Sequence, residues 1–320
     1  MRALRFSEFG APSKLSLVEM RDPEPDAATV VVRVVASSVN PSDVKNVAGL
    51  MEGTVLPRVP GRDFSGIVEA GPPEWLGAEV WGTGGDIGFS QDGAHAERLA
   101  FPTAGLVRKP RNLTHGVTAA IGLTFVVAWL GAIDYAAARP GETVAVIGAG
   151  GGVGGAVIQI VKALGCRVIA VDRAERPLPP AGGLIDEFVS AASDVPAEVK
   201  RLTGGQGADL IFDTVGGVMF ESALLSLRRR GRLVEISGTG RRRVAFDLID
   251  FYHNESRIFG ADTRKLDPVD SAKILAALVP GFEAGRLRPP AIARTSSLAD
   301  GVAAYEAVAT GTRGRVVIAP

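Results

Sequence analysis

The chain has 320 residues, which is long enough for two domains at about 150 residues each. Its hydrophobic share of 46% and charged share of 22% are those of a folded enzyme and exclude a disordered or fibrous protein. The 35 basic residues balance the 35 acidic ones, so the overall charge gives no support to nucleic-acid binding.

Short alternating segments broken by Pro and Gly fill the first third of the chain. Residues 1–10 alternate like a strand and lack the apolar core of a signal peptide, which favours a cytoplasmic location. Residues 30–35, 66–69 and 97–101 also read as strands, with turns such as D-P-E-P-D between them. This region is predicted to be an antiparallel β domain.

Residues 116–133 carry no charge and are just long enough to cross a membrane as one helix. The segment also contains three glycines and two threonines and leads directly into the next predicted strand. A buried helix at a domain junction explains it better than a membrane span, so no membrane partner is expected.

Residues 143–172 are the most informative part of the chain. They read as a buried strand, a glycine-rich turn, an amphipathic helix, and a second strand ending in Asp172. Glycines let the backbone approach a dinucleotide pyrophosphate, the helix N-terminus offers free N–H groups, and an acid about 20 residues on suits a ribose. The alternative is a glycine-rich joint without a ligand. The residues assigned to a cofactor here are Gly148, Gly151, Gly152, Val153, Gly154 and Asp172.

Strands and helices alternate in the following part of the chain. Strands are predicted at residues 208–213, 231–237 and 257–261, and a helix at 220–227. This order predicts a doubly wound parallel sheet, so the fold class is α/β. From residue 268 we expect a helix, a proline-rich turn, a second helix and a closing strand. Residues 176–183 read as a loop, and Cys166, the single cysteine, as a buried inert thiol.

The order of motifs resembles the medium-chain dehydrogenase/reductase superfamily. The motifs that carry this resemblance are N-P-S-D-V-K, P-G-R-D-F-S-G-I-V, D-G-A-H-A-E, A-A-I-G-L-T, G-A-G-G-G-V-G and D-T-V-G-G. The resemblance implies a GroES-like substrate domain from residues 1–122 and 263–320. It also implies a Rossmann dinucleotide-binding domain from residues 123–262, and a homodimer.

The sequence departs from zinc-dependent alcohol dehydrogenases at the metal ligands. Asn40 stands where that family has a cysteine, Arg62 where it has a histidine, and a third cysteine would lie near Gly122. Without thiolates and imidazole, a tetrahedral zinc site has no ligands, so no metal is expected. The pattern resembles the zinc-free branch, which implies reduction of quinones or α,β-unsaturated carbonyls with NAD(P)H. Reduction of enoyl thioesters is the alternative.

Reduction of a quinone or enone builds negative charge on an oxygen, which needs hydrogen-bond donors or a cation. Asn40 and Lys45 are the catalytic candidates, Asn40 through its amide and Lys45 through its ammonium group. The alternatives are that Asn40 caps a short helix with Asp43 and that Lys45 is a solvated surface residue.

Three further positions complete the expected cofactor site. Thr124 matches a family position that holds the nicotinamide carboxamide. Val215 follows the predicted strand at residues 208–213, and Ser237 is the last residue of the one at 231–237. The choice between NADH and NADPH is open. Asp172 suits a ribose diol and repels a 2′-phosphate, whereas Arg173 and Arg176 suit that phosphate.

Two arginine runs and three histidines have simpler interpretations. Residues 228–232 are expected to end a helix, where cations suit the dipole. Residues 241–243 are either a solvated loop or a contact for an acyl-CoA phosphate. His95, His115 and His253 are isolated in sequence and are expected in loops or at the surface.

A function from another class is a nucleotide sensor or a single-stranded nucleic-acid binder. The zero net charge and an aromatic share of 6% argue against nucleic acid, since such binders use basic grooves and stacked aromatic rings. We therefore expect a small-molecule substrate.

Overall fold

The computed structural model describes residues 1–173 and 181–320. The chain divides into two compact units. The first consists of residues 1–123, 263–285 and 289–320, and the second of residues 124–262 and 286–288.

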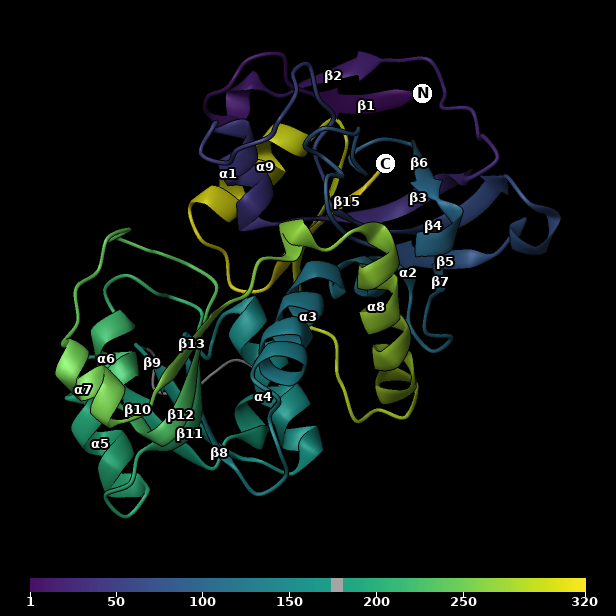
Figure 1. Cartoon of the computed structure of the whole chain (residues 1–320). Coiled ribbons are helices and arrows are strands. Elements are labelled where there is room, and N and C mark those ends of the chain that lie inside the picture. The colour runs from purple at the N-terminus through teal and green to yellow at the C-terminus, as the bar shows by residue number, and fades with distance from the viewer. Residues whose placement is uncertain (174–180) are drawn as a thin grey trace. The chain divides into compact units, whose positions relative to one another are not determined.

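The strands of the first unit are β1 (Arg2–Arg5), β2 (Ser16–Glu19), β3 (Thr29–Val39), β4 (Asp63–Ala70), β5 (Glu79–Gly82), β6 (Arg98–Pro102), β7 (Val107–Arg108), β14 (Ile292–Ser297) and β15 (Arg315–Ala319). Seven of them form one mainly antiparallel sheet in the order β14-β15-β3-β4-β5-β7, with β6 also paired to β3 (Figure 1). β1 and β2 form a separate antiparallel pair.

The helices of the first unit are α1 (Pro41–Val47), α2 (His115–Ala119), α8 (Pro268–Glu283) and α9 (Gly301–Ala309). Residues from both ends of the sequence share this unit, because β15 pairs antiparallel with β3, with Val317 opposite Ser38. Phe64 and Phe101 meet edge to face with ring centroids 4.7 Å apart in one of its apolar clusters.

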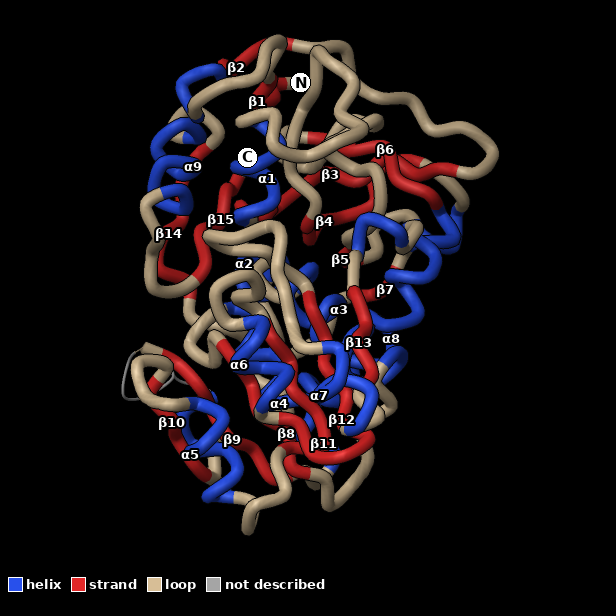
Figure 2. The backbone as a smooth tube through the Cα atoms, turned by 60° about the vertical axis from the view of Figure 1, so that its left-hand side comes forward, coloured by secondary structure: helices blue, strands red, loops and turns tan. Residues whose placement is uncertain are grey.

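The strands of the second unit are β8 (Thr143–Ile147), β9 (Arg167–Asp172), β10 (Glu187–Ser190), β11 (Ala208–Asp213), β12 (Leu227–Glu235) and β13 (Arg257–Gly260). They form a six-stranded sheet in the order β10-β9-β8-β11-β12-β13, and every neighbouring pair is parallel (Figure 2). Its helices are α4 (Gly152–Leu164), α5 (Val195–Leu202), α6 (Phe220–Leu225) and α7 (Leu248–His253). α3 (Gly122–Trp129) begins in the first unit and continues into the second.

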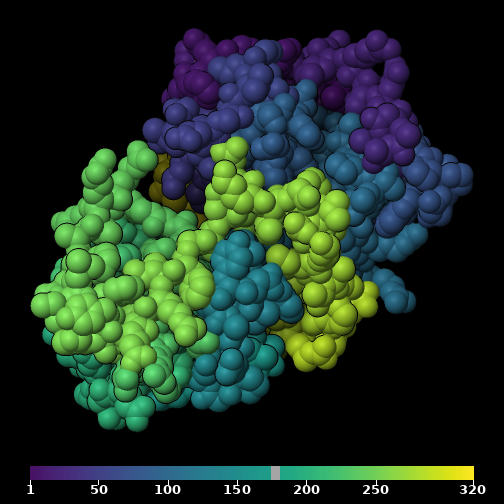
Figure 3. All heavy atoms as spheres, viewed as in Figure 1, coloured from purple at the N-terminus to yellow at the C-terminus, as the bar shows by residue number. Residues whose placement is uncertain are grey.

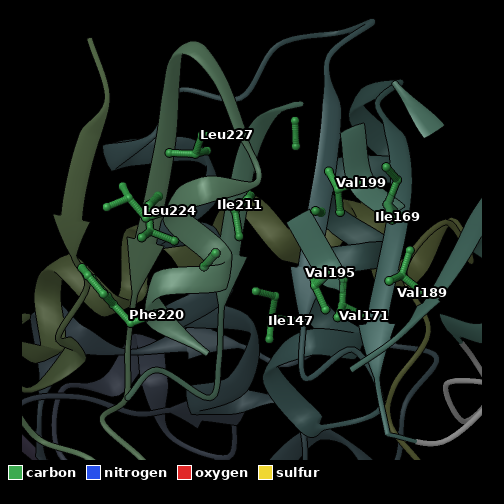
Figure 4. Close-up of a cluster of buried hydrophobic side chains, with 14 residues drawn as sticks. Ile147, Ile169, Val171, Val189, Val195, Val199, Ile211, Phe220, Leu224 and Leu227 are labelled. Carbon is green, nitrogen blue, oxygen red and sulfur yellow. The ribbon is translucent and has the colours of Figure 1, made fainter. Parts of the chain in front are cut away.

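Side chains from both the sheet and its helices fill the core of the second unit. Ile147, Ile169 and Ile211 of the strands pack with Val199 of α5 and Leu224 of α6 (Figure 4). Such near-continuous apolar strands are expected where a parallel sheet is covered on its faces. Each fully buried side chain of this size contributes about 1.5–3 kcal/mol.

The predicted fold class is confirmed. The strands predicted at residues 30–35, 66–69 and 97–101 correspond to β3, β4 and β6, and residues 143–172 form β8, α4 and β9 as expected. β14 was not predicted, because its sequence I-A-R-T-S-S is largely polar and the strand lies at an edge of its sheet. Of the loop predicted at residues 176–183, residues 176–180 lie outside the described residues, and a 3-10 helix begins at Ala181.

Residues 116–133 are mostly buried and contain the boundary between the two units, as predicted, but they do not form a single helix. The segment forms α2, then α3, then a π-helix over Leu130–Tyr135. The backbone N–H of Leu123 donates to Asp63 Oδ1 at 2.8 Å, so α3 starts afresh beside that carboxylate. Within residues 1–173 and 181–320, no helix has both the length and the apolar character that a membrane crossing requires.

The prediction that residues 228–232 end a helix was also wrong. α6 ends at Leu225, and the arginines belong to β12, whose pairing with β11 shifts in register at this point. Arg228 binds Asp209 at 2.5 Å, and Arg229 and Arg230 bind Glu255. Partner carboxylates, and not a helix dipole, therefore balance these charges.

Candidate active site

The glycine turn of the second unit has the shape of a phosphate cradle. Gly148 follows β8 with φ +75°, and a Cβ there would lie 2.2 Å from Thr214 Oγ1. A Cβ at Gly154 would lie 2.2 Å from the Gly148 carbonyl oxygen, so the turn packs directly on the first helical residues. Only glycine satisfies both positions.

The N-terminus of α4 is open at this turn. Gly151 is its N-cap and supplies no side-chain acceptor, and the first N–H groups of a helix, here those of Gly152 and Val153, have no intrahelical partner. Free N–H groups together with the positive dipole end suit a pyrophosphate. The turn therefore fits a dinucleotide.

Asp172 lies against the same turn. Its Oδ2 accepts from the Gly150 N–H at 2.7 Å, and its Oδ1 accepts from the Arg173 N–H at 2.6 Å. An ionised carboxylate has about four acceptor positions, so two are left for ribose hydroxyls. Arg173 is thereby placed next to the acid, whereas Arg176 lies outside the described residues.

The remaining predicted cofactor residues of the sheet lie at its carboxyl edge, where β8, β9, β11 and β12 end. Val215 follows β11, and its carbonyl accepts from the Thr239 N–H at 3.0 Å. Ser237 follows β12, and its Oγ lies 3.2 Å from Thr239 Oγ1. The second unit thus brings Gly148, Asp172, Val215 and Ser237 to one edge, which is where ligands bind in such sheets.

Two acids that the sequence did not mark as site residues lie at the ends of β11 and β12, just before the loops that carry Val215 and Ser237. Asp213 ends β11, Glu235 ends β12, and the two are direct partners in the parallel ladder. Burial is the main cause that raises the pKa of both, that of Glu235 to about 8. The motif D-T-V-G-G contains Asp213, but only the strand register shows that Glu235 is beside it.

Thr124 is buried in α3, at the start of the second unit. Residues 241–243 are exposed in the loop that follows β12. Their location at the carboxyl edge agrees with the expectation that they follow a strand on the ligand side.

In the first unit, Asn40 belongs to a buried polar network (the Asn40 network: Ser38, Asn40, Asp63 and Arg315). Asn40 Nδ2 donates to Asp63 Oδ2 at 3.0 Å, and Asn40 Oδ1 accepts from Arg315 Nη2 at 2.7 Å. Arg315 Nη2 also donates to Ser38 Oγ at 2.9 Å. Both ends of the Asn40 amide are therefore occupied, and its orientation is fixed.

Asn40 also begins α1, as the capping alternative expected. Its backbone N–H donates to Asp43 Oδ2 at 2.7 Å. Burial, more than any other cause, raises the pKa of Asp43 to about 7, and the nearby Asp63 carboxylate adds to this effect. Lys45 is exposed on the same helix.

Sequence reasoning missed Asp63 and Arg315 as parts of this region. Asp63 lies in the motif P-G-R-D-F, but the motif does not show its partners. Its Oδ1 accepts from the Leu123 N–H, and its Oδ2 accepts from the Ser38 hydroxyl and the Asn40 amide. Arg315 opens the closing strand and carries no local signal. Arg62, which stands at the histidine position of zinc enzymes, is 2% exposed and lies over the ring of Phe89 at 5.6 Å.

His95 lies in a loop, one of the two environments expected for it, but it is not at the surface. Its ring is fully buried, with Nδ1 2.9 Å from the Tyr305 hydroxyl and Nε2 3.3 Å from the Ser38 carbonyl. Since a carbonyl accepts, Nε2 carries the proton and Tyr305 donates to Nδ1. Burial lowers the pKa of His95 to about 4, so the ring is neutral.

Cys166 is buried and its Sγ lies 3.2 Å from the Arg139 carbonyl oxygen. Burial raises the pKa of this thiol to about 11, so it is an inert side chain. Among residues 1–173 and 181–320, no three His, Cys, Asp or Glu side chains form a group that could hold a metal ion.

Comparison with known proteins adds independent findings. The model of the alcohol dehydrogenase GroES-like domain matches residues 26–111, and that of the zinc-binding dehydrogenase matches residues 152–278. A zinc-type alcohol dehydrogenase-like protein of Schizosaccharomyces pombe is 34% identical over 300 residues, which cover 90% of this chain and 87% of that protein. The quinone oxidoreductase of Homo sapiens is 28% identical over 295 residues, with 90% and 88% covered. A solved quinone oxidoreductase from Pseudomonas syringae pv. Tomato DC3000 has a TM-score of 0.87 and 25% identity, with 100% of this chain and 99% of that chain covered.

Proposed function

Since the chain belongs to the medium-chain dehydrogenase/reductase superfamily and is of the quinone oxidoreductase type, we propose that it is a zinc-independent reductase of quinones or α,β-unsaturated carbonyls. The observation that carries the proposal is the glycine cradle of Gly148 and Gly154 beside Asp172. This cradle fits a nicotinamide dinucleotide, which supplies the hydride when bound.

The zinc-independent part of the proposal rests on the donors present. An amide at Asn40 and a guanidinium at Arg62 are not ligands that zinc prefers. The amide is in addition held by Asp63 and Arg315. The one thiol, Cys166, belongs to the other unit and is buried there beside Arg139. A zinc-type alcohol dehydrogenase-like protein is among the relatives, so the experiment that tests the proposal includes added zinc.

The chain's own residues have separate tasks in this reaction. The turn and Asp172 hold the dinucleotide, and the second unit's carboxyl edge orients it. Hydride addition to the β-carbon of an enone moves the C=C pair into the bond to the carbonyl carbon and the C=O pair to oxygen; solvent then protonates the α-carbon and the C=O bond re-forms. Hydride addition to a quinone also leaves negative charge on an oxygen, which takes a proton from solvent. We propose that Lys45, which is exposed, stabilises the negative charge on that oxygen. Asn40 would act indirectly, because it fixes the start of α1, the helix that carries Lys45.

The test follows cofactor absorbance on metal-stripped protein with a chelator present. NADH and NADPH are each offered with one quinone, one enone and one enoyl thioester. We expect turnover of a quinone or enone with at least one cofactor. Turnover that needs added zinc contradicts zinc independence, and cofactor binding without any turnover favours a nucleotide sensor.

Substitution of Lys45 by methionine tests its role. We expect kcat to fall by about tenfold or more, since removing a charged donor to a developing oxyanion costs roughly 1.5 kcal/mol or more. Lys200→Met, at an exposed lysine of α5, is the matched control and should leave kcat unchanged. Equal effects in the two variants would remove Lys45 from the mechanism.

Reduction of an enoyl thioester is the second candidate. The exposed arginines at residues 241–243 support it, since guanidinium groups at the ligand edge suit the phosphates of a CoA ester. Replacing all three by glutamine should raise KM for an enoyl-CoA and spare a free enone. The same change for both substrates rules the candidate out.

We further propose that the protein forms a homodimer through the second unit. β13 ends the six-stranded sheet, and exposed apolar side chains lie on β13 and on the preceding helix α7, namely Leu248, Ile249, Tyr252 and Ile258. The light green surface of Figure 3 includes α7, which carries three of them. Light scattering should give twice the monomer mass of 33.2 kDa, and Ile258→Glu should give the monomer. An unchanged mass in this variant contradicts the proposed interface.

A further inference from the structure

Asp213 and Glu235 form a buried pair of acids that the reaction proposed above does not use. Asp213 is fully buried, and its register partner across the β11–β12 ladder is Glu235. Asp213 Oδ1 accepts from the N–H groups of Val215 and Gly216, each at 2.8 Å. Asp213 Oδ2 and both oxygens of Glu235 are buried and meet no donor from other described residues.

Two carboxylates in this arrangement are compatible with burial only when they share a proton. The two acids are register partners in the ladder, and an O–H on one carboxyl group would supply the donor that their buried oxygens lack. Asp213 already receives two N–H bonds, which favour its charged form, so the proton resides on Glu235 and Glu235 donates to Asp213. One negative charge is then held by three donors.

Among the described residues, the strands on either side of β11 and β12 place no further charged side chain beside this pair, so the proton stays assigned to Glu235. The neighbouring strands place Ile147 of β8 beside Asp213 and Gly260 of β13 beside Glu235. The charged group that acts on Glu235 is Asp213. In the loop above, the Ser237 and Thr239 hydroxyls bond to each other.

The pair lies under two loops that are tightly packed on each other, residues 214–217 and 236–239. Gly216 forms a bridge with Gly238, and the Thr239 N–H donates to the Val215 carbonyl at 3.0 Å. A Cβ at Gly216 would lie 1.9 Å from the Ser237 carbonyl oxygen and 3.1 Å from Glu235 Oε2. A second negative charge at Glu235 would therefore act directly on the contact between these loops.

We propose that the proton shared by Asp213 and Glu235 positions loops 214–217 and 236–239 for the cofactor, and that its loss weakens cofactor binding. Glu235 is a positioning residue in this scheme, since it acts through the loops that carry Val215 and Ser237. The inference rests on the proposed function, because these loops belong to the proposed cofactor site.

The test measures the dissociation constant of NADH by fluorescence between pH 6.5 and 9.5. In the wild type we expect Kd to be constant below pH 8 and to rise at least about fivefold by pH 9.5, within the limit of about tenfold per pH unit for loss of one proton. Glu235→Gln places a permanent N–H donor opposite Asp213, so its Kd should stay constant within about twofold. Glu221→Gln, at an exposed acid of α6, should keep the wild-type slope.

Asp213→Asn is the second variant, because its oxygen still accepts the two loop N–H groups while its amide donates to Glu235. Unfolding curves at each pH separate loss of affinity from loss of the fold. A wild-type Kd that does not change with pH, or a pH dependence that persists in both variants, overturns this inference alone. A wild type that binds neither NADH nor NADPH at any pH overturns the proposed function together with it.

Discussion

Gly154 is a position where one added methyl group should strongly weaken cofactor binding. An alanine Cβ there would lie 2.2 Å from the Gly148 carbonyl oxygen and 2.9 Å from the Ala149 Cα. Ordinary contacts lie near 3.5 Å, so the turn must move by about 1 Å. Because both atoms belong to the backbone, no change of rotamer can relieve the contact.

A shift of this size moves the N–H groups that we assign to the pyrophosphate. A hydrogen bond to a charged group contributes about 1.5–3 kcal/mol, so loss of one weakens binding by about tenfold to 150-fold. The adjacent Gly155 provides a matched control. Its Cβ would lie 3.7 Å from the Ala181 Cβ, an ordinary contact, and alanine inside a helix is favoured over glycine by about 1 kcal/mol.

The assay titrates NADH and NADPH into wild type, Gly154→Ala and Gly155→Ala, and measures urea unfolding of each. We expect Gly154→Ala to bind at least about tenfold more weakly. Gly155→Ala should bind as the wild type does and be more stable by about 0.5–1 kcal/mol. Wild-type affinity in Gly154→Ala would refute the close approach of turn and helix as the basis of binding.

Three further changes test other parts of the molecule. Arg315→Met leaves the buried Asp63 without its cation and should lower the free energy of unfolding, measured in urea, by about 3–5 kcal/mol. Arg313→Met, at an exposed arginine nearby, is the control and should change it by less than about 0.5 kcal/mol. An equally small change in Arg315→Met would contradict the Asn40 network. Asp172→Ser removes the charge that opposes a 2′-phosphate and should shift the ratio of the NADH and NADPH dissociation constants by about tenfold or more towards NADPH, and an unchanged ratio speaks against a ribose contact. Because the pKa of His95 is about 4 in the folded protein and near 6.5 unfolded, the unfolded chain binds more protons between these values. The wild type should therefore lose up to about 3 kcal/mol relative to His95→Gln as the pH falls from 6.5 to 4, and parallel stability curves would exclude a neutral buried ring.

The dinucleotide unit could be predicted from sequence because its signal is local. Strand, turn, helix and Asp172 follow one another within residues 143–172, and the spacing of apolar residues and glycines determines each element. The pairing of Asp213 with Glu235 could not be predicted in the same way, since it depends on the register of two parallel strands.

In the first unit, most of the helices and strands that were expected are present, but the side-chain contacts between distant segments could not be predicted. The partners of Asn40 lie 23 and 275 residues away in the sequence, and Tyr305 lies 210 residues from His95. No periodicity links such distant side chains, so the sequence did not predict that His95 is buried or that Asp63 and Arg315 hold the Asn40 amide. The arginines at residues 228–232 were assigned to the end of a helix, because the sequence shows where the charges lie but not that they belong to strand β12.

The pairing of β15 with β3 sets an order of events during protein synthesis. Residues 29–39 leave the ribosome early, but their neighbour in the sheet, and the Arg315 that binds Asn40, are made last. The second unit is nearly complete by residue 262, so its sheet can form while β3 still has an open edge. β4 and β6 can pair with β3 early, but residues 37–39 of β3 lack their neighbour β15 for most of elongation. A chaperone that covers this short open edge would protect it until β15 is made.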